Sequence, residues 1–151
     1  MRTAIALVAL TASLPHAGVL VPGRSLGGVH IGEASAAVRA ALGPHGVCDG
    51  CSPTTWYFTY RPFTQPGLAV ELTAGRVSAV YTIWSPAGWH TPTGQRLGAG
   101  LTKLAQHVSS VQCPSYIALV HDEGGTRTVY YVVDGKLWGF GLMLPGTSPC
   151  R

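Results

Sequence analysis

The fold expected for this chain depends on residues 28–43, which read GVHIGEASAAVRAALG. A weaker copy follows at residues 94–109, where the sequence is GQRLGAGLTKLAQHVS. Both copies place glycine at the same two positions and aliphatic residues six and ten positions after the second glycine. In the first copy this four-residue spacing puts Val38 and Leu42 on one face of a helix. The repeated pattern predicts a structural unit that the chain uses twice.

Each copy is expected to form a helix, from about Ala34 to Leu42 in the first and from about Leu101 to Ser109 in the second. Three segments rich in aromatic and β-branched residues follow each helix and predict strands. In the first unit these segments are 55–60, 68–72 and 76–83, and in the second unit they are 116–120, 128–133 and 136–142. Hairpin turns are predicted at residues 74–75 and, from the Asp-Gly pair, at residues 134–135.

These elements predict an α+β fold class with two tandem helix-plus-antiparallel-meander units, at residues 25–85 and 93–144. A small meander leaves one face uncovered unless a helix packs on it. We therefore expect the helices on one face of a β-sheet, with the other face open as a broad surface. Residues 18–25 are expected to form an exposed lead-in, because they contain Pro22 and Gly23.

Residues 1–17 have the features of a secretory signal peptide, because a basic start precedes a short apolar run. That run is too short to span a bilayer, so we expect no stable membrane insertion. The expected location is secreted, or periplasmic within the cell envelope. The formal net charge is +4, but the ten basic residues are scattered singly. This scatter argues against a nucleic-acid partner.

Four cysteines in an exported chain favour two disulfides, for which three pairings exist. The favoured pairing joins Cys48 to Cys51 and Cys113 to Cys150. The second bond would close a loop of about 38 residues, contribute about 4 kcal/mol, and fasten the tail at residues 145–151.

Cys48 and Cys51 also have the two-residue spacing of redox and zinc sites, and His45 precedes them. No helix is predicted to begin beside Cys48 and lower the pKa of its thiol. No fourth zinc ligand lies nearby in the sequence. A secreted metal-binding or redox protein that uses Cys48 and Cys51 is the alternative function.

The motif Gly28 to Gly32, the helix that ends at Leu42-Gly43-Pro44, and the following meander resemble the SmpA/OmlA-like domain of the outer-membrane assembly lipoprotein family. In tandem, the arrangement is similar to that of the β-lactamase inhibitory proteins. The resemblance covers residues 25–144. It implies an envelope module and, more narrowly, an inhibitor of a secreted or periplasmic hydrolase such as a β-lactamase. No contact residue of such inhibitors maps onto this chain.

Residue patterns typical of catalysis are not found: the sequence has no Gly-x-Ser-x-Gly motif and no phosphate-binding loop. We therefore expect a protein that is not an enzyme, with no metal and no cofactor. The expected function is a secreted, non-catalytic protein-binding module that acts through its sheet face and loops. The expected partner is a protein, for example a secreted hydrolase.

Aromatic residues supply the candidate binding surface. Strand alternation puts Trp56, Phe58 and Tyr60 on one face of their strand and Tyr57 on the other. It puts Trp138 and Phe140 on a common face, and it puts the neighbours Tyr130 and Tyr131 on opposite faces. An exposed aromatic cluster is typical of a recognition surface. The predicted binding residues are Tyr57, Tyr130, Tyr131, Trp84 and Trp89. Trp89 has a second interpretation, in which it packs at the junction of the two units and stabilises both.

Overall fold

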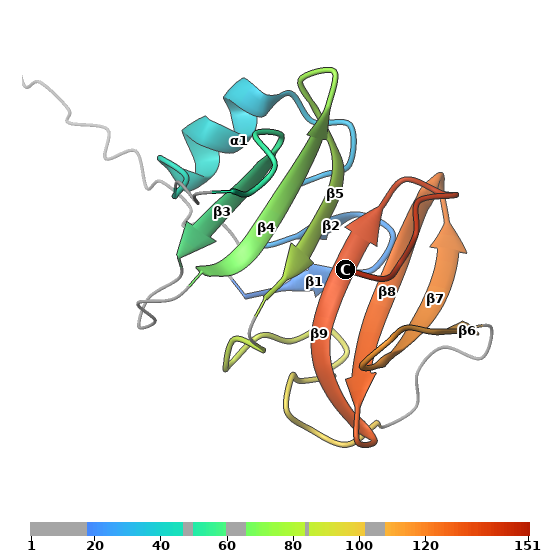
Figure 1. The fold of residues 1–151 in the computed structure, drawn as a ribbon. Helices are drawn as coiled ribbons and strands as arrows, with labels where there is room; N and C mark the ends of the chain where they lie inside the picture. The colour runs from blue at the N-terminus through green and yellow to red at the C-terminus, as the bar shows by residue number, and fades with distance from the viewer. Residues whose placement is uncertain (1–17, 47–49, 60–65, 84, 102–107) are drawn as a thin grey trace, which may run out of the picture.

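The computed structural model describes residues 18–46, 50–59, 66–83, 85–101 and 108–151. In that part of the chain it contains a seven-stranded sheet, a two-stranded sheet and one helix (Figure 1). In chain order the elements are β1 (Leu20–Val21), β2 (Ser25–Leu26), α1 (Ser35–Leu42), β3 (Thr55–Thr59), β4 (Pro66–Thr73), β5 (Arg76–Thr82), β6 (Ser109–Gln112), β7 (Ile117–Glu123), β8 (Thr126–Val133) and β9 (Lys136–Met143). None of the helical sequence in these ranges has the length and hydropathy of a membrane span.

The large sheet has the strand order β3-β4-β5-β9-β8-β7-β6, and all of its neighbouring strands are antiparallel. The six predicted strand segments correspond to β3, β4, β5, β7, β8 and β9. Both predicted hairpins form, and both central residues of each turn have positive φ: 51° and 75° at Ala74 and Gly75, and 49° and 71° at Asp134 and Gly135. Such turns match the twist of the strands that they join.

The predicted fold class, α+β with two tandem helix-plus-meander units, is wrong. The described residues contain one helix, α1, and are otherwise mostly β. Most of the second predicted helix, residues 102–107, lies outside the described part. Its predicted last residue, Ser109, instead begins β6 and pairs with Val120. The two meanders are joined directly, because β5 pairs with β9 within one continuous sheet.

The two glycine-containing copies nevertheless contact the sheet in the same way. The amide of Gly32 donates to the carbonyl of Val77 at 2.8 Å, and the amide of Gly98 donates to the carbonyl of Leu137 at 2.7 Å. Each bond lies at the start of a strand, β5 or β9. The sequence pattern thus marks a loop that bonds to the start of a strand in both copies.

One face of the sheet is covered by α1, by β1 and β2, and by the connection that contains Trp89. The buried residues of this core are Leu20, Leu26, Val29, Val38, Phe58, Leu68, Val70, Val77, Val80, Trp89, Tyr130, Leu137, Phe140 and Leu142. The expectation of an exposed lead-in at residues 18–25 is wrong, because Leu20 is fully buried. Backbone pairing holds this segment: the amide of Leu20 donates to the carbonyl of His90 at 2.9 Å.

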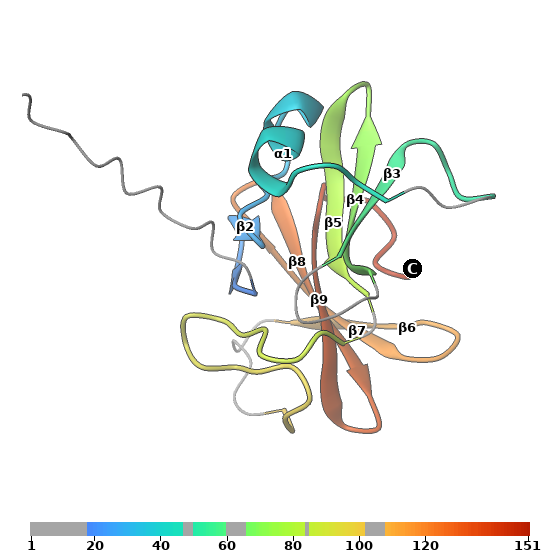
Figure 2. The ribbon, with the colours of Figure 1, turned by 90° about the vertical axis from the view of Figure 1, so that its left-hand side faces the viewer.

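The other face carries a second, smaller core beneath the C-terminal segment. Its members include Ala79, Tyr81, Tyr131 and Met143. The predicted disulfide between Cys113 and Cys150 is confirmed, with its Cα atoms 5.6 Å apart. Figure 2 shows α1 and β2 on one side of the sheet and the C-terminus on the opposite side. The disulfide therefore fastens the C-terminal segment across the face that α1 leaves uncovered.

Candidate binding groove

The sheet opens where β5 and β9 stop pairing. These strands are in register over only three residue pairs, from Ala79 with Met143 to Tyr81 with Gly141. At the next position the buried hydroxyl of Thr82 accepts a hydrogen bond from the amide of Phe140 at 2.9 Å and donates one to its carbonyl at 3.4 Å. The Thr82 side chain thus replaces the backbone ladder, and the strands diverge beyond it (Figure 1).

An open groove of about 620 Å³ lies at this divergence, on the face away from α1. Its size is within the usual range for ligand sites. We call it the aromatic groove, because five of its ten lining residues are Tyr or Trp. The lining residues are Tyr57, Tyr81, Thr82, Ile83, Ser115, Tyr116, Tyr131, Val133, Trp138 and Arg151.

A β-bulge brings Trp138 into the aromatic groove. Tyr131 pairs with Gly139, but the next residue of β8, Val132, pairs with Leu137, so Trp138 is the extra residue. A bulge shifts the alternation of side chains by one position. The prediction that Trp138 and Phe140 share a face is therefore wrong. Trp138 lines the groove with 36% of its surface exposed, whereas Phe140 is fully buried in the opposite core.

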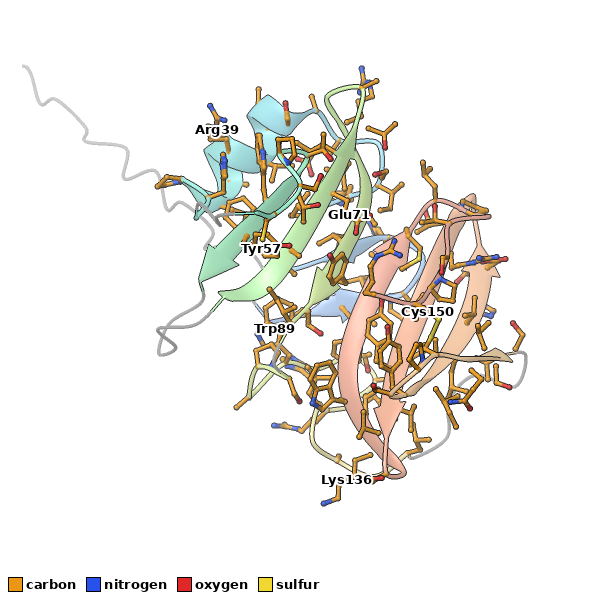
Figure 3. The ribbon with its side chains drawn as sticks, in the orientation of Figure 1. Arg39, Tyr57, Glu71, Trp89, Lys136 and Cys150 are labelled. Atoms are coloured by element: carbon orange, nitrogen blue, oxygen red, sulfur yellow. A yellow bond between two sulfur atoms is a disulfide. The ribbon has the colours of Figure 1, made fainter. Side chains whose placement is uncertain are left out.

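Arg151 forms the charged wall of the aromatic groove and is held from several directions. Its Nε atom is 3.0 Å from the carboxylate of Glu71 in β4, and its guanidinium carbon is 5.4 Å from the ring centre of Tyr81. Its main-chain carbonyl accepts a hydrogen bond from the Tyr116 hydroxyl at 2.7 Å. Figure 3 labels Glu71 and Cys150, the residue that precedes Arg151 in the chain. The disulfide at the preceding residue thus places a guanidinium beside the tyrosines.

Two tyrosines of the aromatic groove remain neutral well above physiological pH. Burial raises the pKa of Tyr81, and the negative charge of Glu71 raises it further. Burial also raises the pKa of Tyr131, although the positive charge of Arg151 acts in the opposite direction. Both hydroxyl groups therefore keep their protons and can donate hydrogen bonds.

The structure does not bring the predicted binding residues together on one surface. Tyr57 and Tyr131 line the aromatic groove together. Tyr130 is 8% exposed and lies in the opposite core, where its ring meets Phe140 edge-on at 6.0 Å. Trp89 is 3% exposed in the same core, in agreement with its predicted packing role. Trp84 lies outside the described residues.

The second pair of predicted disulfide cysteines is only partly described. Cys51 is disulfide-bonded, and Cys48 lies outside the described residues. The nearby His45 stacks on Trp56 with ring centres 4.3 Å apart. Arg39 of α1 lies 4.9 Å from the centre of the same indole. Across the described ranges, no group of three or more His, Cys, Asp or Glu side chains is arranged to hold a metal ion.

Sequence reasoning missed eight of the ten groove residues, including Tyr81, Tyr116, Trp138 and Arg151. The position of Trp138 depends on a bulge that strand alternation does not reveal. Arg151 had a usable signal, because it follows a cysteine whose pairing was predicted. That pairing keeps Arg151 close to the sheet, because it holds the preceding residue beside Cys113, next to β6.

Comparisons with known proteins show similarity in the fold alone. No family model matches the sequence, and no curated protein matches it significantly. A DUF4309 family protein, YjgB from Bacillus subtilis, is similar with a TM-score of 0.52 and 18% identity, over 74% of this chain and 78% of that chain. An extracellular protein containing an SCP domain from Bacillus anthracis is similar with a TM-score of 0.50 and 12% identity, over 76% of this chain.

The similar region is 44% of the Bacillus anthracis chain, so the present chain spans less than half of that protein. At such low identity the two structures carry no site residue or activity to this chain. Neither is described as an SmpA/OmlA-like protein, and that resemblance stays a prediction.

Proposed function

We propose that this protein is an exported, non-catalytic binding module that recognises a partner protein through the aromatic groove. The observation that carries the proposal is the groove itself, which is open, lined by tyrosine and tryptophan, and closed at one side by a paired arginine. Tyrosine, tryptophan and arginine are the residues that most often dominate the free energy of protein recognition.

Three observations support export. Residues 1–17 have the composition of a signal peptide. The Cys113–Cys150 disulfide is of the kind that persists in oxidising compartments. One of the structurally similar proteins is described as extracellular.

The proposal is tested by asking whether retention of a partner depends on the groove. The purified protein is immobilised and exposed to the secreted and envelope fractions of its source organism, and the retained proteins are quantified by mass spectrometry. Trp138→Ala is expected to reduce retention of the partner by about tenfold or more, as for an interface hot spot.

Ile117→Ala is the matched control. Ile117 is 40% exposed, much like Trp138 at 36%. Its neighbour Ala118 belongs to the core on the groove side, so strand alternation places Ile117 on the opposite face of the sheet. This variant is expected to retain the partner as the wild type does. If Trp138→Ala retains the same proteins in the same amounts as the wild type, the groove is not the binding surface and the proposal is refuted.

Inhibition of a secreted or periplasmic hydrolase is a narrower form of this proposal, motivated by the resemblance to the β-lactamase inhibitory proteins. A panel of hydrolases that includes β-lactamases is assayed with and without excess protein. The inhibitory role would be supported if the wild type inhibits a hydrolase and Trp138→Ala does not. No inhibition across the panel would remove the inhibitory role and leave the binding role to the retention experiment.

A further inference from the structure

The floor of the aromatic groove holds a buried hydroxyl group that has no hydrogen-bond partner among the described residues. This group belongs to Tyr131, which is 3% exposed. Its ring packs over two glycines of β9. A Cβ atom at Gly141 would lie 2.9 Å from the hydroxyl oxygen, and one at Gly139 would lie 3.0 Å from Cδ2. The sheet thus provides a fitted space for this ring.

A contribution to the stability of the fold does not explain why residue 131 carries a hydroxyl group. A buried donor without a partner lowers the stability of the folded state, and phenylalanine would fill the same space without that loss. Polar groups that reduce stability in this way are typical of functional sites. Tyr131 lines the aromatic groove, so its unpaired hydroxyl is the polar group that a bound partner could satisfy.

The polar groups at the groove include available donors, whereas the nearest carboxylate is engaged. The Glu71 carboxylate, beside the groove, is ion-paired with Arg151, whose Nε atom lies 3.0 Å from it. The Thr82 hydroxyl is bonded to the backbone of Phe140. Arg151 Nη1 donates to two main-chain carbonyls of the C-terminal segment, but no hydrogen bond between described residues uses its Nη2 atom. Arg151 Nη2 and the Tyr131 hydroxyl are therefore available as donors.

This arrangement determines the ligand chemistry that fits. The Glu71 carboxylate balances the charge of Arg151, so an acceptor need not be charged. The walls formed by Tyr57, Tyr81 and Trp138 suit an apolar or aromatic body. A sugar is a poorer fit, because its hydroxyl groups donate as well as accept, and no carboxylate or side-chain amide is among the lining residues to accept from them.

We propose that the aromatic groove takes an apolar or aromatic side chain of the partner protein, and that Tyr131 and Arg151 donate hydrogen bonds to a main-chain carbonyl beside that side chain. This inference rests on the proposed function of the groove. The Tyr131 hydroxyl is buried in the free protein, and the Tyr131 ring meets the Tyr116 ring edge-on with their centres 5.3 Å apart. In this proposal the Tyr116 ring, which also lines the groove, shifts on binding so that the carbonyl reaches the hydroxyl.

The test uses N-acetyl-L-tryptophanamide as a probe, because it joins an aromatic side chain to two neutral carbonyl groups. Titration is followed by two-dimensional ¹H–¹⁵N NMR on the full chain, with N-acetylglycinamide and N-acetylglucosamine as comparison ligands. We expect millimolar binding of the tryptophan probe, with shifts at Thr82, Tyr116 and Trp138, and no comparable shifts from the other two.

Two variants separate this inference from the proposed function. Tyr131→Phe is expected to bind the tryptophan probe about three- to tenfold more weakly, which corresponds to one lost hydrogen bond, while its melting temperature stays at or above that of the wild type. A purely structural role would instead lower the melting temperature and leave the affinity unchanged. Trp138→Ala is expected to weaken probe binding as well, and Ile117→Ala is expected to leave it unchanged.

Equal affinity of Tyr131→Phe and wild type for the probe would overturn the role of the hydroxyl. If Trp138→Ala still reduced partner retention, the groove would remain the binding surface. Absence of probe shifts in the groove would overturn the proposed ligand chemistry. Shifts there from N-acetylglucosamine alone would identify a sugar ligand and would overturn the choice of a protein segment.

Discussion

Replacement of Trp89 by alanine is expected to destabilise the whole protein in one cooperative transition. The indole is 3% exposed and belongs to the core that includes Leu20 and Phe140. A Cβ atom at Gly18 would be 3.7 Å from its Cδ1 atom, so the N-terminal segment packs directly on it. Removal of a buried tryptophan side chain costs about 3 to 5 kcal/mol. For a chain of this size that loss lowers the melting temperature by roughly 10 °C.

The assay is thermal and urea unfolding followed by far-ultraviolet circular dichroism, with Trp138→Ala as the control. Trp138 is 36% exposed on the other face, so its removal is expected to cost clearly less stability than removal of Trp89. A melting temperature for Trp89→Ala within about 2 °C of the wild type would refute the reasoning, because removal of a buried indole lowers the free energy of unfolding by more than such a small shift allows. Two separate transitions would show that the region around Trp89 unfolds independently of the sheet.

Three further predictions concern the face that carries the aromatic groove. Replacing both Cys113 and Cys150 by serine is expected to lower the free energy of unfolding by about 4 kcal/mol in urea titrations, and a loss below about 1 kcal/mol would contradict the loop-closure argument. Gly141→Ala is expected to cost about 1 to 3 kcal/mol, because its Cβ would crowd the Tyr131 hydroxyl; adding Tyr131→Phe should recover part of this loss in a double-mutant cycle. Because burial raises the pKa values of Tyr81 and Tyr131 on folding, ionisation of these groups disfavours the folded state, so stability is unaffected by them below a pH of about 10 and falls as the pH rises further. Absorbance at 295 nm should show these tyrosines ionising only as the protein unfolds, and early ionisation of all tyrosines in the folded state would count against their burial.

Much of the local structure could be predicted, because local signals determine it. The strands follow from β-branched and aromatic composition, and the hairpins at Ala74-Gly75 and Asp134-Gly135 follow from residues that accept positive φ. The helix α1 follows from an alanine-rich run with apolar residues four positions apart.

The global arrangement could not be predicted, because it depends on long-range pairing. The docking of β5 on β9 and the pairing of Leu20 with His90 leave no periodic signal in the sequence. The second glycine copy was interpreted as a helix start because its pattern matches the first. In the structure the shared feature is the loop that bonds to Val77 or Leu137 at the start of a strand.

The lining of the aromatic groove was predicted in part. Strand alternation predicted Tyr57 and one of Tyr130 and Tyr131 on the open face, and the structure puts Tyr57 and Tyr131 in the groove. Alternation failed for Trp138 because a bulge adds one residue to β9. The lack of a hydrogen-bond partner for the Tyr131 hydroxyl among the described residues could not have been predicted, because it depends on which residues lie near this group in space.

The most direct test of the binding account is a photo-crosslinking experiment with the full chain. A benzophenone amino acid replaces Trp138 in one variant and Ile117 in another, and each variant is irradiated with the secreted and envelope fractions of the source organism. The two positions have similar exposure, 36% and 40%, on opposite faces of the sheet. The account predicts one dominant covalent adduct with a protein at position 138 and none of that adduct at position 117. The same adduct at both positions, or at position 117 alone, would contradict it.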